Sequence, residues 1–139
     1  MLKTRTVLWV GIALLLLAGA ALGYRSIFRP HESTAGKTAD FAISADTLYQ
    51  QYQADEHAAD QKYLNKVIEV TGKLAEIQHS GTSEIWILSQ HTGAGGINCQ
   101  LFAGTKVEPE PKSGDEVTVK GRCTGFLMDV NLADCVTSK

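Results

Sequence analysis

The feature that most constrains this chain is an uninterrupted apolar run near its N-terminus. Residues 7–24 read VLWVGIALLLLAGAALGY, without a charged or strongly polar side chain. At 18 residues, a helical run is at the lower limit of what crosses the roughly 30 Å hydrocarbon layer of a bilayer. Residues 1–6 form a short tail that carries Lys3 and Arg5. The sequence therefore predicts one N-terminal transmembrane anchor.

A cleaved signal peptide is the alternative interpretation of this run. Its small-residue cleavage site would be residues 18–20, which lie inside the run and not after it. The residues that follow the run, 24–29, mix aromatic and basic side chains, as the membrane interface favours. We therefore expect an uncleaved anchor.

The orientation of the anchor rests on the layout of its N-terminus. Basic residues flank both sides of the run, so the positive-inside rule discriminates little. The very short N-terminal tail and the signal-like layout favour an N-terminus in the cytoplasm. The C-terminal domain is then expected outside, in the periplasm or the extracellular space.

After the anchor, residues 25–42 have the composition of a flexible linker, with Pro, Ser, Thr, Gly and charge. Residues 43–65 predict an amphipathic helix, because Leu48, Tyr52, Ala59 and Tyr63 recur at helical spacing. Ser44 or Asp46 would cap it. The pattern equally fits two short helices that break near residues 54 and 55.

The remaining chain, residues 66–139, predicts β-strands. Alternating or apolar segments bounded by turn residues predict five of them: 66–77, 84–90, 97–102, 116–123 and 130–136. Gly72 lies inside the first segment, where glycine often marks a bulge or a sharp coil. We expect a mainly β fold, a small five-stranded barrel of the OB type preceded by the helix. An open sheet or an SH3-like barrel is the alternative.

The quoted segments resemble a known family. Residues 62–77 (KYLNKVIEVTGKLAEI), 96–101 (GINCQL) and 114–135 (GDEVTVKGRCTGFLMDVNLADC) are similar to the tRNA_anti-like family of bacterial OB-fold proteins. The N-terminal run followed by Arg29-Pro30-His31 looks like the subset with a transmembrane segment. The resemblance implies an OB barrel with a preceding helix, and it implies no reaction.

Charge weighs against nucleic acid as the partner of the domain. Thirteen of the 15 acidic residues but only eight of the 13 basic residues lie from Phe41 onward, which leaves a formal charge near −5. Phosphate backbones are bound by clustered Lys and Arg. Nucleic acid is therefore an unlikely partner, although the family resemblance keeps it as the alternative.

A ligand face can be proposed from the OB geometry. OB barrels bind ligands through side chains on their second and third strands and the adjoining loops. Trp86, Phe102 and Phe126 are the candidate stacking residues, of which Trp86 and Phe102 could lie on this face. The basic residues that could face outward are Lys73, Lys120 and Arg122. Trp86 equally fits a core position, because its neighbours in the strand are apolar.

The three cysteines allow one disulfide. Cys99, Cys123 and Cys135 all lie in the predicted barrel, and two of them could pair in an oxidising compartment. The pairing is not decided by the sequence, and three buried thiols are the alternative. Their spacing matches no zinc motif, so we expect no metal site.

No catalytic motif is present. The sequence has no G-x-S-x-G elbow, and its carboxylates show no spacing typical of acid–base pairs. We therefore expect a membrane-anchored binding module without enzymatic activity or cofactor. Its ligand would be a small molecule, a glycan or a protein partner in the cell envelope.

Overall fold

The computed structural model describes residues 2–27, 33–89 and 95–138. The chain divides into two compact units, Met1–His31 and Glu32–Lys139. The motif of Arg29, Pro30 and His31 lies outside the described residues. Each unit is taken by itself below.

The N-terminal unit is one helix, α1 (Leu2–Ile27). The predicted anchor, residues 7–24, lies within it, and side chains are described for residues 9–21 and 23. Leu15, 75 % exposed, and Trp9, 71 % exposed, are typical of its apolar side chains, which pack on nothing else in this unit. Within the described part of the chain, no helix combines the length and the apolar character that a membrane crossing requires.

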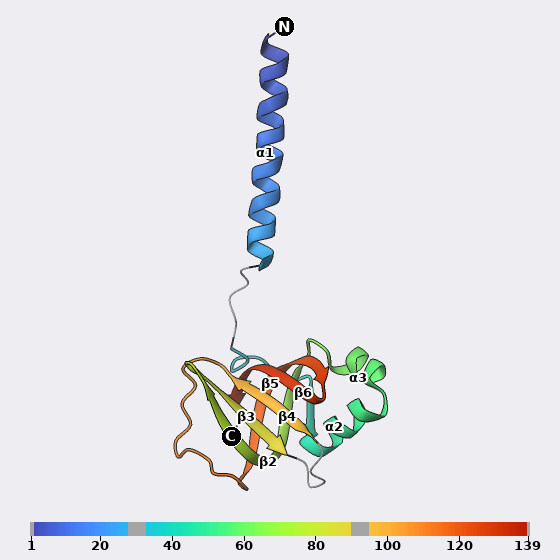
Figure 1. Ribbon diagram of the computed structural model, residues 1–139, viewed down its shortest axis with the longest axis vertical. Coiled ribbons are helices and arrows are strands. Elements are labelled where there is room, and N and C mark those ends of the chain that lie inside the picture. Colours follow the sequence, from blue (N-terminus) through green and yellow to red (C-terminus); the bar gives the residue numbers. More distant parts are fainter. Residues whose placement is uncertain (1, 28–32, 90–94, 139) are drawn as a thin grey trace. The chain divides into compact units, whose positions relative to one another are not determined.

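The C-terminal unit is a closed five-stranded barrel with helices at one end (Figure 1). Its strands run in the order β2-β3-β4-β6-β5, and β5 pairs with β2 to close the barrel. Their bounds are β2 (Val67–Ser80), β3 (Ser83–Ser89), β4 (Gly96–Leu101), β5 (Glu116–Leu127) and β6 (Asp129–Thr137). Only the β4–β6 pairing within this barrel is parallel. This topology is that of an OB fold, and the predicted five-stranded OB barrel is confirmed.

Two short helices precede the barrel, α2 (Ala45–Ala54) and α3 (Glu56–Tyr63). The Ser44 side chain caps α2 by accepting a hydrogen bond from the Thr47 amide at 3.2 Å. Asp55 has an extended backbone, ends α2 and caps α3 by accepting from the Ala58 amide at 3.0 Å. The sequence alternative of two helices broken at this point is therefore confirmed.

A short strand, β1 (Phe41–Ser44), was not predicted by the sequence. It pairs in parallel with β2, so that Phe41 lies opposite Ile68 and Ser44 opposite Thr71. Four residues are too few for alternation to stand out in the sequence. The predicted linker, residues 25–42, therefore ends in a strand of the sheet.

The linker prediction needs a second correction, because residues 33–40 are held against the barrel. Thr34 is buried, and its hydroxyl lies 2.8 Å from the carbonyl oxygens of both Lys120 and Asp134. The Asp40 carboxylate accepts a hydrogen bond from the Val67 amide at 3.0 Å. Linker-like composition does not reveal these bonds, since each joins one side chain to a backbone group of the barrel that is distant in sequence.

The core is formed by the inward faces of the strands and by the two helices. Trp86, Leu88 and Val119 are buried inside the barrel, and Leu48 and Tyr52 of α2 cover its end. Other buried members include Tyr63, Ile68, Val70, Leu74, Ile97, Val130 and Leu132. Burial of such side chains contributes about 1.5–3 kcal/mol each, which makes this cluster the main stabilising element of the domain.

The barrel depends on register shifts at its closing strands. The β5–β6 ladder shifts between Lys120 and Arg122 and again between Cys123 and Gly125. Asp134 has a positive φ of 56°, and the fully buried Cys135 follows it. Simple alternation along β6 would place Cys135 out of phase with Leu132, so the irregularity is what brings this thiol inward.

Thr34→Val should destabilise the domain. Valine preserves the shape but removes the hydroxyl that meets two barrel carbonyls, and an unsatisfied buried polar group costs about 1–3 kcal/mol. We expect a loss of that size in urea unfolding of the full chain in non-ionic detergent, with faster tryptic cleavage near Lys37. Thr38→Val is the matched control, because Thr38 is exposed. Equal free energies of unfolding and equal cleavage rates in the two variants would show that the Thr34 hydrogen bonds do not hold residues 33–40 against the barrel.

Candidate functional site

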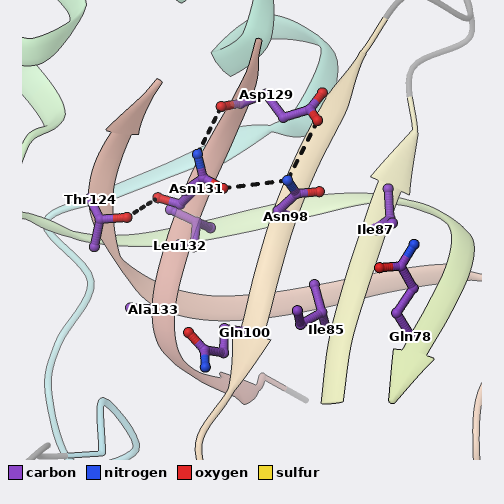
Figure 2. Close-up of a pocket in the computed structure, with 10 residues that line it drawn as sticks. All are labelled: Gln78, Ile85, Ile87, Asn98, Gln100, Thr124, Asp129, Asn131, Leu132 and Ala133. Carbon is purple, nitrogen blue, oxygen red and sulfur yellow. Dashed lines mark hydrogen bonds between the residues drawn. The ribbon is translucent and has the colours of Figure 1, made fainter. Parts of the chain in front are cut away.

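The outer face of the barrel carries a cavity of about 400 Å³ across β3, β4 and β6. Figure 2 shows side chains from these strands and from β2 and β5 around it. Six of the ten carry an amide, a carboxylate or a hydroxyl, and the other four are apolar. We call this the amide cavity, and its residues are Gln78, Ile85, Ile87, Asn98, Gln100, Thr124, Asp129, Asn131, Leu132 and Ala133.

A network of polar side chains holds the centre of the amide cavity in place. The Asn98 amide nitrogen lies 3.5 Å from Asp129 Oδ2 and 3.4 Å from Asn131 Oδ1 (Figure 2). The Asn131 amide donates to the Asp129 carbonyl at 3.1 Å, and the Thr124 hydroxyl donates to the Asn131 carbonyl at 3.1 Å. The two bonds of Asn98 are long, so its amide retains capacity for a ligand.

Asp129 has a structural role in this network. Its Oδ1 accepts a hydrogen bond of 2.7 Å from the Gly96 amide, at the start of β4. Asp129 thus connects the beginning of β6 to the beginning of the neighbouring strand. The Gln100 amide, by contrast, is exposed and is free of hydrogen bonds to the other residues that the structure describes.

A second cavity of about 550 Å³ adjoins the first. The two share Gln100, Thr124 and Asn131, so they form one continuous depression, which we call the outer groove. The second cavity extends to α3 and to the β5–β6 turn. We call it the acidic cavity, and its further residues are Glu56, Asp60, Leu64, Gly125, Phe126 and Leu127.

The predicted basic residues lie outside the outer groove. Lys120 Nζ donates to the Ala35 carbonyl at 3.3 Å, and Arg122 forms an ion pair with Asp134 at 3.0 Å. Lys73 is exposed on β2, where it lies opposite Ser89 and Glu116. None of the described residues that line the groove is Lys, Arg or His.

The predicted aromatic residues also lie elsewhere. Trp86 is 1 % exposed and points into the core, so the core interpretation of this residue holds. Phe102 is half-buried just after β4 and lines neither cavity of the groove. Phe126 does line the acidic cavity, where its ring is stacked 5.5 Å from that of Tyr52.

The polar residues of the groove were missed by the sequence reasoning, although one signal was present. In β4, Ile97, Cys99 and Leu101 alternate inward, which places Asn98 and Gln100 on the outer face. Two amides in succession on the exposed face of a strand are the part of this site that alternation can reveal. The contributions of Asn131 and of α3 depend on the closure of the barrel.

The cysteines are three free, buried thiols in this structure, so the predicted disulfide is absent. A hydrogen bond with Cys135 and burial raise the pKa of Cys99 well above its usual range. Burial also raises the pKa of Cys123, whose sulfur lies 3.2 Å from the Tyr52 hydroxyl. Thiols with a raised pKa are poor nucleophiles, and the described residues hold no group of three or more metal-ligating side chains.

Stability should fall at alkaline pH. Burial, followed by the Cys123 interaction, also raises the pKa of Tyr52. A folded chain that keeps these groups protonated has its full stability below their ordinary pKa values, about 8.5 for Cys and about 10 for Tyr. It loses stability as pH rises above them. Urea unfolding should give a constant free energy between about pH 7 and 8 and a decline above that range, and Tyr52→Phe should reduce the decline. A free energy of unfolding that stays constant into strong alkali would contradict this prediction.

Comparisons with known proteins agree on the fold. A family model described as tRNA_anti-like matches residues 1–136. No curated protein matches the chain. A lipoprotein of Klebsiella pneumoniae, described as a candidate nucleic acid-binding protein, is 15 % identical, with a TM-score of 0.55 over 70 % of this chain and 91 % of its own. Yeast Stn1 and Ten1 give 12 % identity and a TM-score of 0.44 over 77 % and 66 %. At 15 % identity, the likeness to the Klebsiella lipoprotein supports the fold alone. The likeness to Stn1 and Ten1 is too low to support any conclusion.

Proposed function

The chain belongs to the tRNA_anti-like family, and we propose that its OB barrel is a binding module whose ligand occupies the outer groove. The observation that carries this proposal is a concave outer face with an exposed amide at Gln100 that makes no hydrogen bond to the other described residues. Side-chain amides donate and accept hydrogen bonds. Such a face supports recognition of a polar ligand, whether a small molecule, a glycan or a segment of an envelope protein. The module acts by binding and not by catalysis.

Nucleic acid is the alternative ligand. The description of the Klebsiella lipoprotein favours it, and OB folds often bind single strands. Single-strand sites combine a basic groove with stacked aromatic rings. The outer groove has neither a basic lining residue among those described nor an aromatic ring in its amide cavity. We therefore propose the non-nucleic ligand first.

We also propose that residues 7–24 anchor the chain in a membrane, with the N-terminus in the cytoplasm and the barrel outside. The support is the apolar run of 18 residues and the short basic tail before it. An anchored module of this kind would act on partners close to the membrane surface.

Photo-crosslinking tests the binding face. Benzoylphenylalanine placed at position 100, in the full chain in its native membranes, should give ligand adducts because Gln100 is exposed at the centre of the groove. Position 112 is the control, because Lys112 is exposed and lines neither cavity. Adducts from both positions alike, or from neither, would argue against the groove. An adduct that nuclease removes would support the alternative function.

A reporter fused after Lys139 tests the placement. Alkaline phosphatase, which is active only outside the cytoplasm, should be active in this fusion, and the protein should remain in membranes washed with carbonate. Deleting residues 7–24 should abolish both properties. An inactive fusion would reverse the orientation, and release of a shortened, active protein would indicate a cleaved signal peptide.

A further inference from the structure

We propose that the partner in the outer groove is a basic polypeptide segment that places a Lys or Arg side chain in the acidic cavity. This inference rests on the proposed function and specifies its ligand. It is carried by the charges, the apolar wall and the amide surface of the groove, taken in turn below.

The charge of the groove is negative and locally uncompensated. Glu56 and Asp60 lie one helical turn apart and both line the acidic cavity, and Asp129 lines the amide cavity. The nearby described cations are held elsewhere. Lys62 lies 4.8 Å from the centre of the Tyr63 ring, and Arg122 bonds to Asp134. Such a surface attracts a cation and repels phosphate.

The wall of the acidic cavity is apolar, which favours a long basic side chain over a bare metal ion. Leu64 is 38 % exposed and Leu127 is 84 % exposed, and half-buried Phe126, which packs against the core, lines the same cavity. Lys and Arg cover such surfaces with their methylene groups while the charged head reaches a carboxylate. A metal ion would leave these side chains in contact with water.

Asp60 adds a further reason for a cation at this end. Its Oδ1 atom is buried and makes no hydrogen bond of good geometry to the described residues, although the Tyr52 hydroxyl lies close enough to the carboxylate to interact with it. A buried carboxylate oxygen without a partner is costly, and a positive charge bound at the accessible side of the same carboxylate would offset part of that cost. Asp60 is half-buried and lines the cavity, so its carboxylate is a suitable partner for the basic group.

The amide cavity suits the backbone of the same segment. Asn98 and Gln100 on β4 and Asn131 on β6 present amides along the groove (Figure 2). These groups match the donors and acceptors of a peptide chain. Ile85 and Ile87 form an apolar floor beside them, where alternate side chains of an extended segment could rest. Among the residues that the structure describes, no ring lines this cavity, so the described part of it offers no stacking surface for bases.

Fluorescence anisotropy with the full chain in non-ionic detergent tests the inference. The probe is a short fluorescein-labelled peptide that alternates lysine and threonine. The comparison probes replace lysine with glutamine or glutamate, and a fourth probe is single-stranded DNA. We expect the lysine peptide to bind most tightly and to weaken as salt is added, because screening reduces the attraction of exposed charges.

The decisive variant is Glu56→Gln with Asp60→Asn. Exposed ion pairs contribute about 0.3–1 kcal/mol each, so the double change should weaken lysine-peptide binding about three- to thirtyfold. Binding of the glutamine peptide should not change. Glu108→Gln with Glu110→Gln is the matched control, since it alters the net charge equally outside the groove. Circular dichroism checks folding, and Glu56→Gln alone serves if the double variant unfolds.

The outcomes separate this inference from the proposed function. Equal binding of lysine and glutamine peptides, with no effect of the double variant, would overturn the basic partner and leave the binding face intact. Absence of peptide binding, together with a crosslinked adduct at position 100, would also overturn the basic partner and leave the binding face intact. Tight, salt-sensitive binding of DNA alone would overturn both proposals.

Discussion

The domain depends on one strand, β2, that has to pair with two partners on its way around the barrel. Residues 67–73 pair with β5 and residues 73–80 with β3, so the strand must coil sharply between the two halves. Gly72 lies at this point, and a Cβ there would be only 2.7 Å from the Cβ of Ala45 in α2. Close approach of the helix to the coiling strand is what seals the end of the barrel. Closure in turn brings β6 beside β4, and the outer groove exists only because of that pairing.

Local patterns in the sequence were enough to predict the elements. Alternation along β5 places Val119, Gly121 and Cys123 inward, and all three are buried. The helix break at Asp55 can also be predicted from the sequence, because a capping residue bonds to residues close to it in the chain. What local patterns do not contain is the irregularity of the ladders. The inward position of Cys135 depends on the register shifts and on the positive φ of Asp134, which accompany barrel closure and follow from no local sequence pattern.

The candidate site was predicted less well, for a related reason. In the run EIWILS, Trp86 and Leu88 face the core while Ile85 and Ile87 face outward, and an apolar run gives no sign of which set is which. The sequence reasoning chose the aromatic residue because binding faces of this fold favour rings. This barrel instead buries Trp86 and lines the face with amides. A site assembled from β3, β4, β6 and α3 requires knowledge of the topology before its members can be recognised.

The hydrogen bonds of the Thr34 hydroxyl to the carbonyls of Lys120 and Asp134 also define where this domain can be cut from the rest of the chain. A fragment that starts at Phe41, where the regular strand pairing begins, would discard a side chain that bridges the carbonyls of the two closing strands. A fragment that starts at Ser33 would keep it. The transferable unit is therefore longer than its barrel. A graft of this domain onto another tether should carry those eight additional residues, 33–40, as part of the folded body.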